Sequence, residues 1–224
     1  MKREIIITAD GSKTIHLPSL DEQYHSKHGA IQEARHVFIE AGLLYLLSVQ
    51  NLPSIKILEI GFGTGLNSFK TQLEAQKREL QIDYTAVEAY PVALSEIKQL
   101  NYATLLNASE TDFLILHTSE WERKNKITNS FSLTKRKQLF LEINDKNTFN
   151  LIYFDAFGAR VQPELWTEVI FQKMYEALNL NGVLVTYSAK GSVRRAMQAV
   201  GFTVERLPGP PGKREMLRAT KKLA

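Results

Sequence analysis

Cysteine is absent from the 224 residues of this sequence. The chain therefore has no disulfide, no thiolate zinc site, no cysteine-held iron–sulfur cluster and no cysteine nucleophile. Any group-transfer chemistry must proceed without these devices.

Long apolar runs are also absent, since none reaches the roughly 18 residues that a membrane-spanning helix needs. The first residues, Met1 to Glu4, lead into a strand-like segment rather than the apolar stretch of a signal peptide. We therefore expect a cytoplasmic protein with no membrane partner. The three histidines His25, His28 and His36 do not have the spacing of a metal site, so we expect no metal.

Acidic residues are scarce in the last part of the chain. Residues 189–224 contain nine Lys/Arg and two Asp/Glu, a local charge of +7, whereas the formal net charge of the whole chain is +4. The first 188 residues therefore carry 4 − 7 = −3. This asymmetry favours a polyanionic partner, although a solvated basic tail is the alternative.

Short apolar strands alternate with helical patterns in most of the chain after residue 55. The strand patterns lie at residues 57–60, 83–88, 150–154 and 182–187. This alternation predicts an α/β fold with a Rossmann-like, mostly parallel sheet covered on both faces. Residues 202–207 and 215–220 are joined by a Pro/Gly loop too short for a crossover, so the C-terminal strand should be antiparallel.

The N-terminal part has a different pattern. Residues 4–17 alternate around Asp10-Gly11, which predicts a hairpin that caps one end of the sheet. Apolar residues then recur at helical spacing from Ile31 to Leu44. We expect residues 1–50 to form a hairpin and helical extension, and residues 51–224 to form the Rossmann-like domain. Residues 101–146 are hard to divide, with a strand at 131–134 and a short helix at 138–143 the clearest elements.

The strongest motif is the glycine run at residues 59–65, E-I-G-F-G-T-G, between a buried strand and a helix. Glycines there allow left-handed backbone angles and close approach of a ligand, and a helix N-terminus offers free N–H groups. Leu66 occupies the third glycine position of the dinucleotide fingerprint, so S-adenosylmethionine is favoured over a nicotinamide or flavin cofactor. Glu88 ends the next strand and can accept both ribose hydroxyls. The predicted cofactor-binding residues are Glu59, Gly61, Phe62, Gly63, Thr64, Gly65, Asn67, Glu88 and Asp155.

Asp155 follows an apolar strand, and its carboxylate should therefore emerge at the edge of the sheet where ligands of α/β folds bind. Phe157 and Trp166 offer aromatic surfaces on which a base can stack, although aromatic residues at such positions are often part of the core. We predict Asp155 and Phe157 as catalytic-site residues. Basic side chains near the C-terminus are the predicted nucleic-acid contacts: Lys190, Arg194, Arg195, Lys213 and Arg214.

In ordered combination, several segments resemble the methyltransferase half of the tRNA-modifying enzyme MnmC and its stand-alone relative MnmD. They are Y-H-S at 24–26, G-F-G-T-G-L-N at 61–67, F-D-A-F at 154–157, P-E-L-W at 163–166, V-R-R at 193–195, A-V-G-F at 199–202 and G-K-R-E-M-L at 212–217. The resemblance implies a class I methyltransferase that uses S-adenosylmethionine, with tRNA as its partner. It also implies methylation of the amine of 5-aminomethyl-2-thiouridine at the wobble position.

The sequence departs from that family at two places and ends where its bifunctional members begin their flavin oxidase. Thr134-Lys135-Arg136 stands where the family often has Gly-Asp on the adenine side of the cofactor, and Gly158-Ala159 stands where it commonly has Ala-Pro. We expect no flavin oxidase domain in this chain. Because thiolate addition is excluded, a nitrogen acceptor is favoured over a pyrimidine ring carbon.

Three other functions fit parts of this pattern. A methyltransferase or aminopropyltransferase for a small amine would use the same glycine run but would not need the basic C-terminal part. A non-catalytic RNA-binding module of the same fold would need neither the glycine run nor Asp155. A nicotinamide oxidoreductase would require a variant of the usual glycine fingerprint.

Overall fold

The central sheet is present in the computed structural model, which describes residues 2–223, and its strand order is β10-β11-β9-β8-β4-β5-β7-β6. Strands β4, β5, β7, β8 and β9 are parallel, whereas β11 runs antiparallel to both β9 and β10, and β6 runs antiparallel to β7. The predicted Rossmann-like fold with an antiparallel C-terminal strand is confirmed. The strands are β4 (Ile55–Ile60), β5 (Ile82–Val87), β6 (Lys124–Lys126), β7 (Phe131–Arg136), β8 (Phe149–Phe154), β9 (Leu178–Thr186), β10 (Thr203–Pro208) and β11 (Glu215–Thr220).

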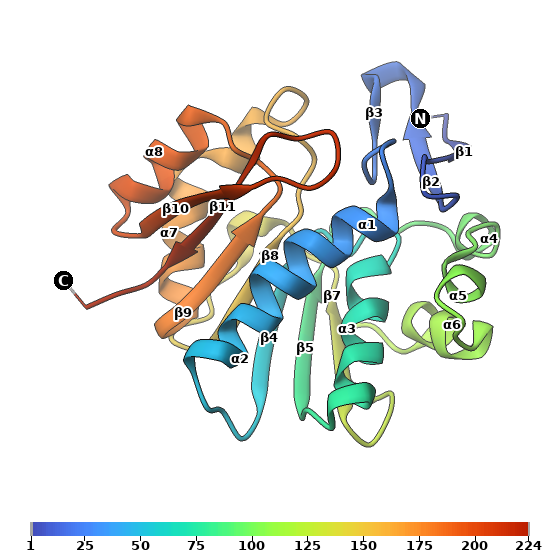
Figure 1. The fold of residues 1–224 in the computed structure, drawn as a ribbon, viewed down its shortest axis with the longest axis horizontal. Coiled ribbons are helices and arrows are strands. Elements are labelled where there is room, and N and C mark those ends of the chain that lie inside the picture. Colours follow the sequence, from blue (N-terminus) through green and yellow to red (C-terminus); the bar gives the residue numbers. More distant parts are fainter. Residues whose placement is uncertain (1, 224) are drawn as a thin grey trace.

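Helices cover both faces of this sheet (Figure 1). One long helix crosses the front of the sheet and contains a π-helical segment, η2, between α1 and α2; α7 and α8 lie behind the sheet. The elements are α1 (Ala30–Ala34), η2 (Arg35–Leu44), α2 (Tyr45–Val49), α3 (Leu66–Arg78), α4 (Leu94–Ile97), α5 (Tyr102–Leu105), α6 (Glu110–Thr118), α7 (Glu168–Ala177) and α8 (Gly191–Ala199), with 3-10 turns η1 (Pro18–Leu20), η3 (Phe140–Glu142) and η4 (Pro163–Trp166). Within residues 2–223, no helix combines the length and apolarity needed to cross a membrane.

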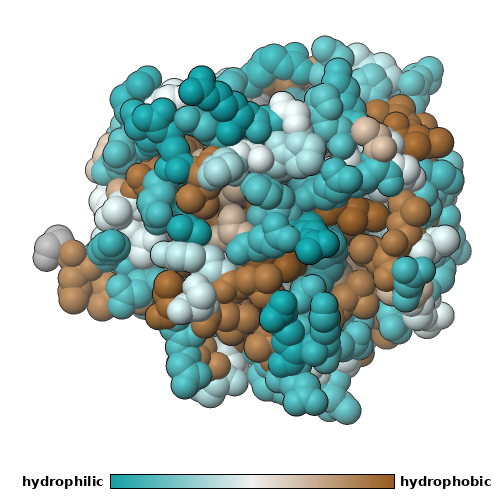
Figure 2. All heavy atoms as spheres, in the orientation of Figure 1, coloured by the Kyte–Doolittle hydropathy of each residue, from teal (hydrophilic) through white to brown (hydrophobic). Residues whose placement is uncertain are grey.

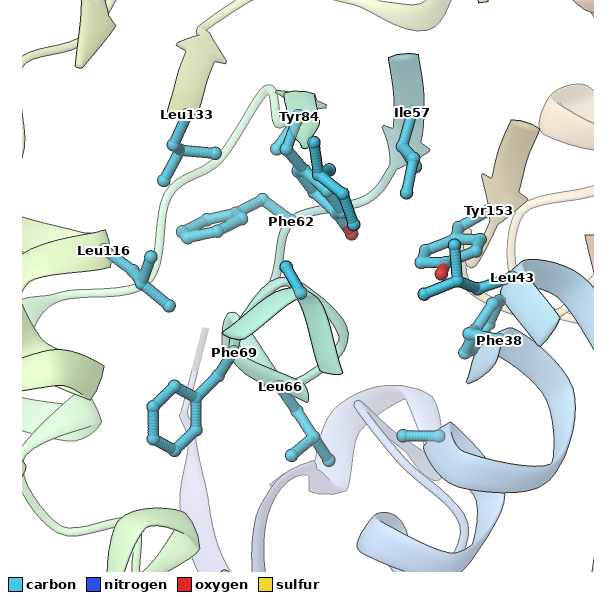
Figure 3. Packing of buried hydrophobic residues seen from close by; sticks show 14 of the residues in the cluster. Phe38, Leu43, Ile57, Phe62, Leu66, Phe69, Tyr84, Leu116, Leu133 and Tyr153 are labelled. Carbon is cyan, nitrogen blue, oxygen red and sulfur yellow. The ribbon is translucent and has the colours of Figure 1, made fainter. Parts of the chain in front are cut away.

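The larger core fills the space between the sheet and the front helices (Figure 3). Phe38 and Leu43 of η2 point toward Tyr153 of β8, while Phe69 of α3 lies farther along the same layer near Leu116 of α6. Burial of such side chains contributes about 1.5–3 kcal/mol each. The N-terminal helix therefore shares one core with the sheet. The outer surface on this side is mixed, with hydrophilic side chains along its upper margin and apolar patches through its middle (Figure 2).

The N-terminal hairpin is present but does not join the main sheet. Strands β1 (Glu4–Ile7) and β2 (Lys13–Leu17) pair with each other, and the short strand β3 (Glu22–Gln23) completes a separate three-stranded sheet. The predicted hairpin is therefore present as a sheet of its own, and Leu17, Glu22 and Gln23 of that sheet line the cleft at the carboxyl ends of the main strands. The η1 turn reverses the chain so that β3 pairs with β2 in antiparallel fashion.

The region from 101 to 146 contains more structure than its sequence suggests. The expected strand at 131–134 is β7, and the expected short helix at 138–143 is reduced to the 3-10 turn η3. Helices α5 and α6 and the edge strand β6 are additional. Ser109 caps α6 by accepting a hydrogen bond from the Asp112 backbone N–H, which fixes where that helix begins.

Candidate cofactor and active site

The glycine run forms the turn between β4 and α3, and its three glycines have positive φ angles. The angles are +91° at Gly61, +50° at Gly63 and +72° at Gly65, in the region that glycine adopts most readily. A Cβ atom on Gly61 would lie 2.8 Å from the Asp155 carbonyl oxygen, and one on Gly63 would lie 3.0 Å from the Tyr24 ring. The turn therefore packs directly against two other segments of the chain.

Glu88 lies at the end of β5, beside this turn. Its Oε2 accepts a hydrogen bond from the Gly63 backbone N–H at 3.0 Å, and its Oε1 accepts one from the Tyr90 backbone N–H at 2.9 Å. A carboxylate oxygen has two lone pairs, so each oxygen retains one for another donor. The two backbone contacts thus orient the Glu88 carboxylate and leave each of its oxygens able to accept another hydrogen bond.

Asp155 lies at the end of β8, on the opposite side of the turn. Its Oδ2 accepts a hydrogen bond from the Asn67 side-chain amide at 2.8 Å. Burial raises the pKa of Asp155 to about 7, and the Glu33 carboxylate acts in the same direction; Asn67 and Lys213 oppose them. The carboxyl group therefore exchanges its proton near neutral pH, as a group that handles a proton in catalysis must.

Glu59 lies behind the turn, near the end of β4. Its side chain is fully buried, and neither carboxyl oxygen has a hydrogen-bond partner among the described residues. Burial raises the pKa of Glu59 well above its usual value, and the nearby Asp155 carboxylate adds to the effect. Glu59 thus lies behind the cleft rather than in its lining, and its burial disfavours the charged form of the carboxyl group.

A cleft of about 810 Å³ opens beyond these strand ends. Of the predicted site residues, those that line it are Gly61, Phe62, Gly63, Thr64, Glu88, Asp155, Phe157 and Lys213. Those that do not are Glu59, Gly65, Asn67, Lys190, Arg194, Arg195 and Arg214. Asn67 still reaches the site through its hydrogen bond to Asp155.

Carboxylates outnumber basic side chains in the lining of the cleft. The carboxylates are Glu22, Glu33, Glu88, Asp155 and Glu164, and the lysines and arginines are Arg3, Lys27 and Lys213. Arg3 and Lys213 are both paired with carboxylates, at 2.9 Å to Glu96 and 2.7 Å to Glu33. The cleft is therefore better suited to a cationic or amine-bearing ligand than to an anion.

Phe157 and Trp166 have different positions. The Phe157 ring lines the cleft and meets Tyr24 edge to face, with ring centroids 4.9 Å apart. The Trp166 ring is buried against Phe154 and Phe171, and its Nε1 donates a hydrogen bond to the Phe157 carbonyl oxygen at 2.7 Å. Phe157 can thus contact a ligand, whereas Trp166 fixes the loop that carries Phe157.

The basic residues form two groups. Lys190, Arg195 and Arg214 are exposed and Arg194 is half-exposed, in or near α8 and the β10–β11 loop. Lys213 instead lies inside the cleft, where its Nζ pairs with Glu33 and sits 3.8 Å from the centroid of the Tyr187 ring. Lys213 is therefore held by the protein, and the other four remain accessible to solvent.

Sequence reasoning did not assign a role to the N-terminal residues that complete the cleft. Tyr24 packs on Gly63, the His25 Nε2 is hydrogen-bonded to the Thr64 hydroxyl at 2.6 Å, and Glu33 holds Lys213. The Y-H-S segment was the available signal, but the sequence does not show where it docks. Within residues 2–223, no cluster of three or more His, Cys, Asp or Glu side chains is arranged to hold a metal ion.

Comparison with known sequences gives a family match and a set of relatives. Residues 116–222 match a family described as S-adenosyl-L-methionine-dependent methyltransferase. The chain is 30% identical over 211 residues to the tRNA 5-methylaminomethyl-2-thiouridine biosynthesis bifunctional protein MnmC of Leptospira borgpetersenii, covering 88% of this chain and 32% of that protein. The MnmC protein of Magnetococcus marinus is 27% identical over 218 residues, with 92% and 32% covered. The chain spans about a third of the length of these curated relatives.

Comparison with solved structures gives one neighbour with an MnmC name and one that shares only the fold. The crystal structure of MnmC2 from Aquifex aeolicus superposes with a TM-score of 0.78 at 27% identity and covers 100% of this chain and 71% of that one. Spermidine synthase from Thermotoga maritima gives a TM-score of 0.58 at 14% identity, with 98% and 73% covered. The second similarity is one of fold alone.

Proposed function

Because the chain belongs to the S-adenosylmethionine-dependent methyltransferases of the tRNA-modifying MnmC family, we propose that it methylates the amine of 5-aminomethyl-2-thiouridine at the wobble position of tRNA. The observation that carries this proposal is the position of Asp155 in a cleft rich in carboxylates, next to the glycine turn. An amine acceptor needs a nearby group that can receive a proton near neutral pH. Asp155, with its pKa of about 7, is suited to that role.

S-adenosylmethionine is the cofactor, and the cleft fits it. The volume of about 810 Å³ lies within the roughly 300–1,000 Å³ range of small-molecule sites. We propose that the backbone of the glycine turn lies against the cofactor and that Glu88 uses its remaining lone pairs to accept the ribose hydroxyls. When bound, the cofactor supplies an electrophilic methyl group on a sulfonium sulfur.

The proposed role of Asp155 follows from the balance of the reaction. A bond forms between the acceptor nitrogen and the methyl carbon while the bond from that carbon to sulfur breaks, and the nitrogen then loses a proton. Asp155 orients the amine and accepts this proton. A neutral amine is already a good nucleophile, so correct positioning of the acceptor should supply most of the rate enhancement. Phe157 is placed to contact the acceptor base at the wall of the cleft.

The charge distribution supports a nucleic-acid substrate. The carboxylate-rich interior suits the amine, while the exposed Lys190, Arg194, Arg195 and Arg214 offer contacts for phosphates outside the cleft. We propose that tRNA binds across this basic surface, with residues 1–50 serving as an extension on the methyltransferase domain of residues 51–224. Action on tRNA implies a cytoplasmic location.

The test is mass spectrometry of nucleosides after incubation of the protein with S-adenosylmethionine carrying a deuterated methyl group and tRNA that contains 5-aminomethyl-2-thiouridine. We expect one labelled methyl group on that nucleoside, and labelling at a much lower rate with the Asp155→Asn variant. Transfer to another nucleoside would contradict the proposed substrate. Transfer of the label to no nucleoside would contradict an action on tRNA.

The carboxylate-rich lining of the cleft also favours a second candidate function, transfer to a small cationic amine. A parallel reaction with a polyamine in place of tRNA separates the two functions. A labelled polyamine together with unlabelled tRNA would favour the second.

A further inference from the structure

We infer that His25 is a positioning residue for the cofactor: its imidazole fixes the Thr64 hydroxyl, and through it the glycine turn, so that the N-terminal extension completes the S-adenosylmethionine site. This inference rests on the proposed cofactor site. It adds a residue far from the glycine motif, on a segment that comes before the central sheet in the sequence.

The contact between His25 and Thr64 is short and shielded from water. The His25 Nε2 and the Thr64 Oγ1 are 2.6 Å apart, and the two residues are 8% and 1% exposed. The Tyr102 hydroxyl donates a further hydrogen bond to the Thr64 Oγ1 at 3.4 Å, and the His25 and Tyr102 rings meet edge to face. Burial lowers the pKa of His25 to about 4, so the ring is neutral near neutral pH. The Thr64 hydroxyl is therefore held from two sides.

Tyr24 packs against the same turn one residue earlier. Its ring lies 3.0 Å from the position of a Cβ on Gly63, the residue whose backbone N–H is bonded to Glu88. Tyr24, His25, Gly63, Thr64 and Glu88 all line one cleft. The orientation of Glu88 thus depends on a turn that the N-terminal segment packs against directly.

The segment that carries His25 is itself held in place by backbone hydrogen bonds. The Tyr24 N–H donates to the Ile15 carbonyl oxygen of β2 at 2.9 Å, and the Ser26 N–H donates to the Glu33 carboxylate at 2.8 Å. His25 is therefore fixed between the hairpin sheet and the beginning of the long N-terminal helix. A ring fixed in this way can hold another side chain, whereas a mobile one could not.

A simpler possibility is that His25 is a buried histidine that only stabilises the fold. Loss of its hydrogen bond would then lower the thermal midpoint and leave cofactor binding unchanged. A positioning role predicts instead that the Kd and KM for the cofactor rise, while kcat at saturating cofactor changes little. The two roles therefore differ in a binding measurement.

The test compares variants in calorimetry with S-adenosylhomocysteine and in steady-state kinetics with S-adenosylmethionine. His25→Phe retains a ring against Tyr102 and removes the hydrogen bond, so we expect Kd and KM to rise about tenfold, the effect of one hydrogen bond. The kcat value should stay within about twofold of wild type. His25→Gln, whose amide can reach Thr64, should restore part of the affinity.

Two further variants make the test specific. If His25 acts through Thr64, the double variant His25→Phe/Thr64→Val should bind no more weakly than Thr64→Val alone. The matched control is His36→Phe, which removes a hydrogen bond of 2.8 Å to the Pro208 carbonyl oxygen and should leave Kd unchanged. If His25→Phe does not fold, Thr64→Val still tests the contact with His25 in place, and an unchanged Kd there would overturn the inference.

Failure of the positioning role and failure of the proposed cofactor site would give different binding results. A wild-type Kd and KM in His25→Phe, together with weakened binding in Glu88→Ala, would overturn the positioning role and leave the proposed cofactor site intact. A wild-type protein that does not bind S-adenosylhomocysteine would contradict the cofactor site itself, and with it the inference.

Discussion

The two walls of the cleft come from different parts of the chain. The sheet wall consists of Gly61–Thr64, Glu88 and Asp155, at the ends of three neighbouring parallel strands. The extension wall consists of Tyr24, His25 and Glu33, which precede the sheet in the sequence. The sheet wall supplies the groups proposed to touch the cofactor and the amine. In the extension wall, Tyr24 and His25 contact the glycine turn through their side chains, so the lining of the cleft includes residues outside the glycine motif.

The largest expected effect is on the sheet wall, at Gly63. Gly63→Val should abolish binding of S-adenosylhomocysteine in calorimetry, because the side chain would meet Tyr24 and the φ angle of +50° strains a β-branched residue. Gly11→Ala is the matched control, since Gly11 also has a positive φ, of +82°, but has nothing within 4 Å of an added Cβ. Undiminished binding in Gly63→Val would show that the two walls do not need this close contact.

Asp155 should have the next largest effect, on the rate rather than on binding. Asp155→Asn should lower kcat about 100-fold, within the range for loss of a general base, and should change the Kd for S-adenosylhomocysteine much less. Because the raised pKa of about 7 leaves the wild-type carboxyl mostly protonated at low pH, kcat/KM should rise as the pH passes upward through 7. The variant should lack this rise and regain some activity at higher pH, where the amine is deprotonated in solution.

Two outcomes would remove Asp155 from the mechanism. A normal rate in Asp155→Asn would show that the carboxylate accepts no proton in catalysis. A variant that fails to fold would make Asp155 structural. Asn67→Ala removes the hydrogen bond to the Asp155 Oδ2, which favours the ionised carboxyl group. In this variant the rise of kcat/KM with pH should therefore occur at higher pH.

Glu88 and Glu33 allow the two walls to be compared directly. Glu88→Ala should weaken cofactor binding by about 1.5–3 kcal/mol, the range for hydrogen bonds to a charged group. Glu33→Gln should change the cofactor Kd less, because Glu33 contacts Lys213 and Ser26 rather than the glycine turn. Calorimetry on both variants shows which of them weakens cofactor binding more. A larger effect from Glu33 would make the extension wall the principal cofactor contact.

The smallest effect should come from the basic residues outside the cleft. Replacement of Lys190, Arg194, Arg195 and Arg214 together by Ala should flatten the slope of log tRNA affinity against log salt by up to about 3 units, at 0.7–0.9 per lost phosphate contact. Cofactor binding should not change. Lys213→Ala is the matched control: Lys213 is already paired with Glu33, so the slope should stay near the wild-type value. An unchanged slope in the quadruple variant would show that this surface does not bind tRNA.

The sheet wall could be predicted because its residues lie in short, recognisable sequence patterns. The run from Glu59 to Gly65 shows a strand, a turn and a helix start within a few residues, and Glu88 and Asp155 each end an apolar strand. Because parallel strands place their carboxyl ends at one edge of a sheet, these groups had to meet. The apolar patterns also predicted the alternation of strands and helices along the chain after residue 55, except in residues 101–146.

The extension wall was not predictable in this way. His25 and Thr64 lie in separate local patterns, and nothing in either pattern shows that the two side chains meet in the interior. Lys213 next to Arg214 reads as one basic pair, yet the fold turns Lys213 into the cleft and leaves Arg214 exposed. Burial of this kind depends on how distant segments dock, which a charge count cannot show.

The pair formed by Glu33 and Lys213 joins residues 180 positions apart, so it has a consequence for how the protein is made. On the ribosome, the N-terminal segment and the glycine turn emerge first, and Glu33 cannot pair with Lys213 until the last hairpin of the sheet has been synthesised. Contacts of such long range form late in folding. A nascent chain therefore contains the glycine turn, Glu88 and Asp155 before the pair that joins the N-terminal helix to the last hairpin can form.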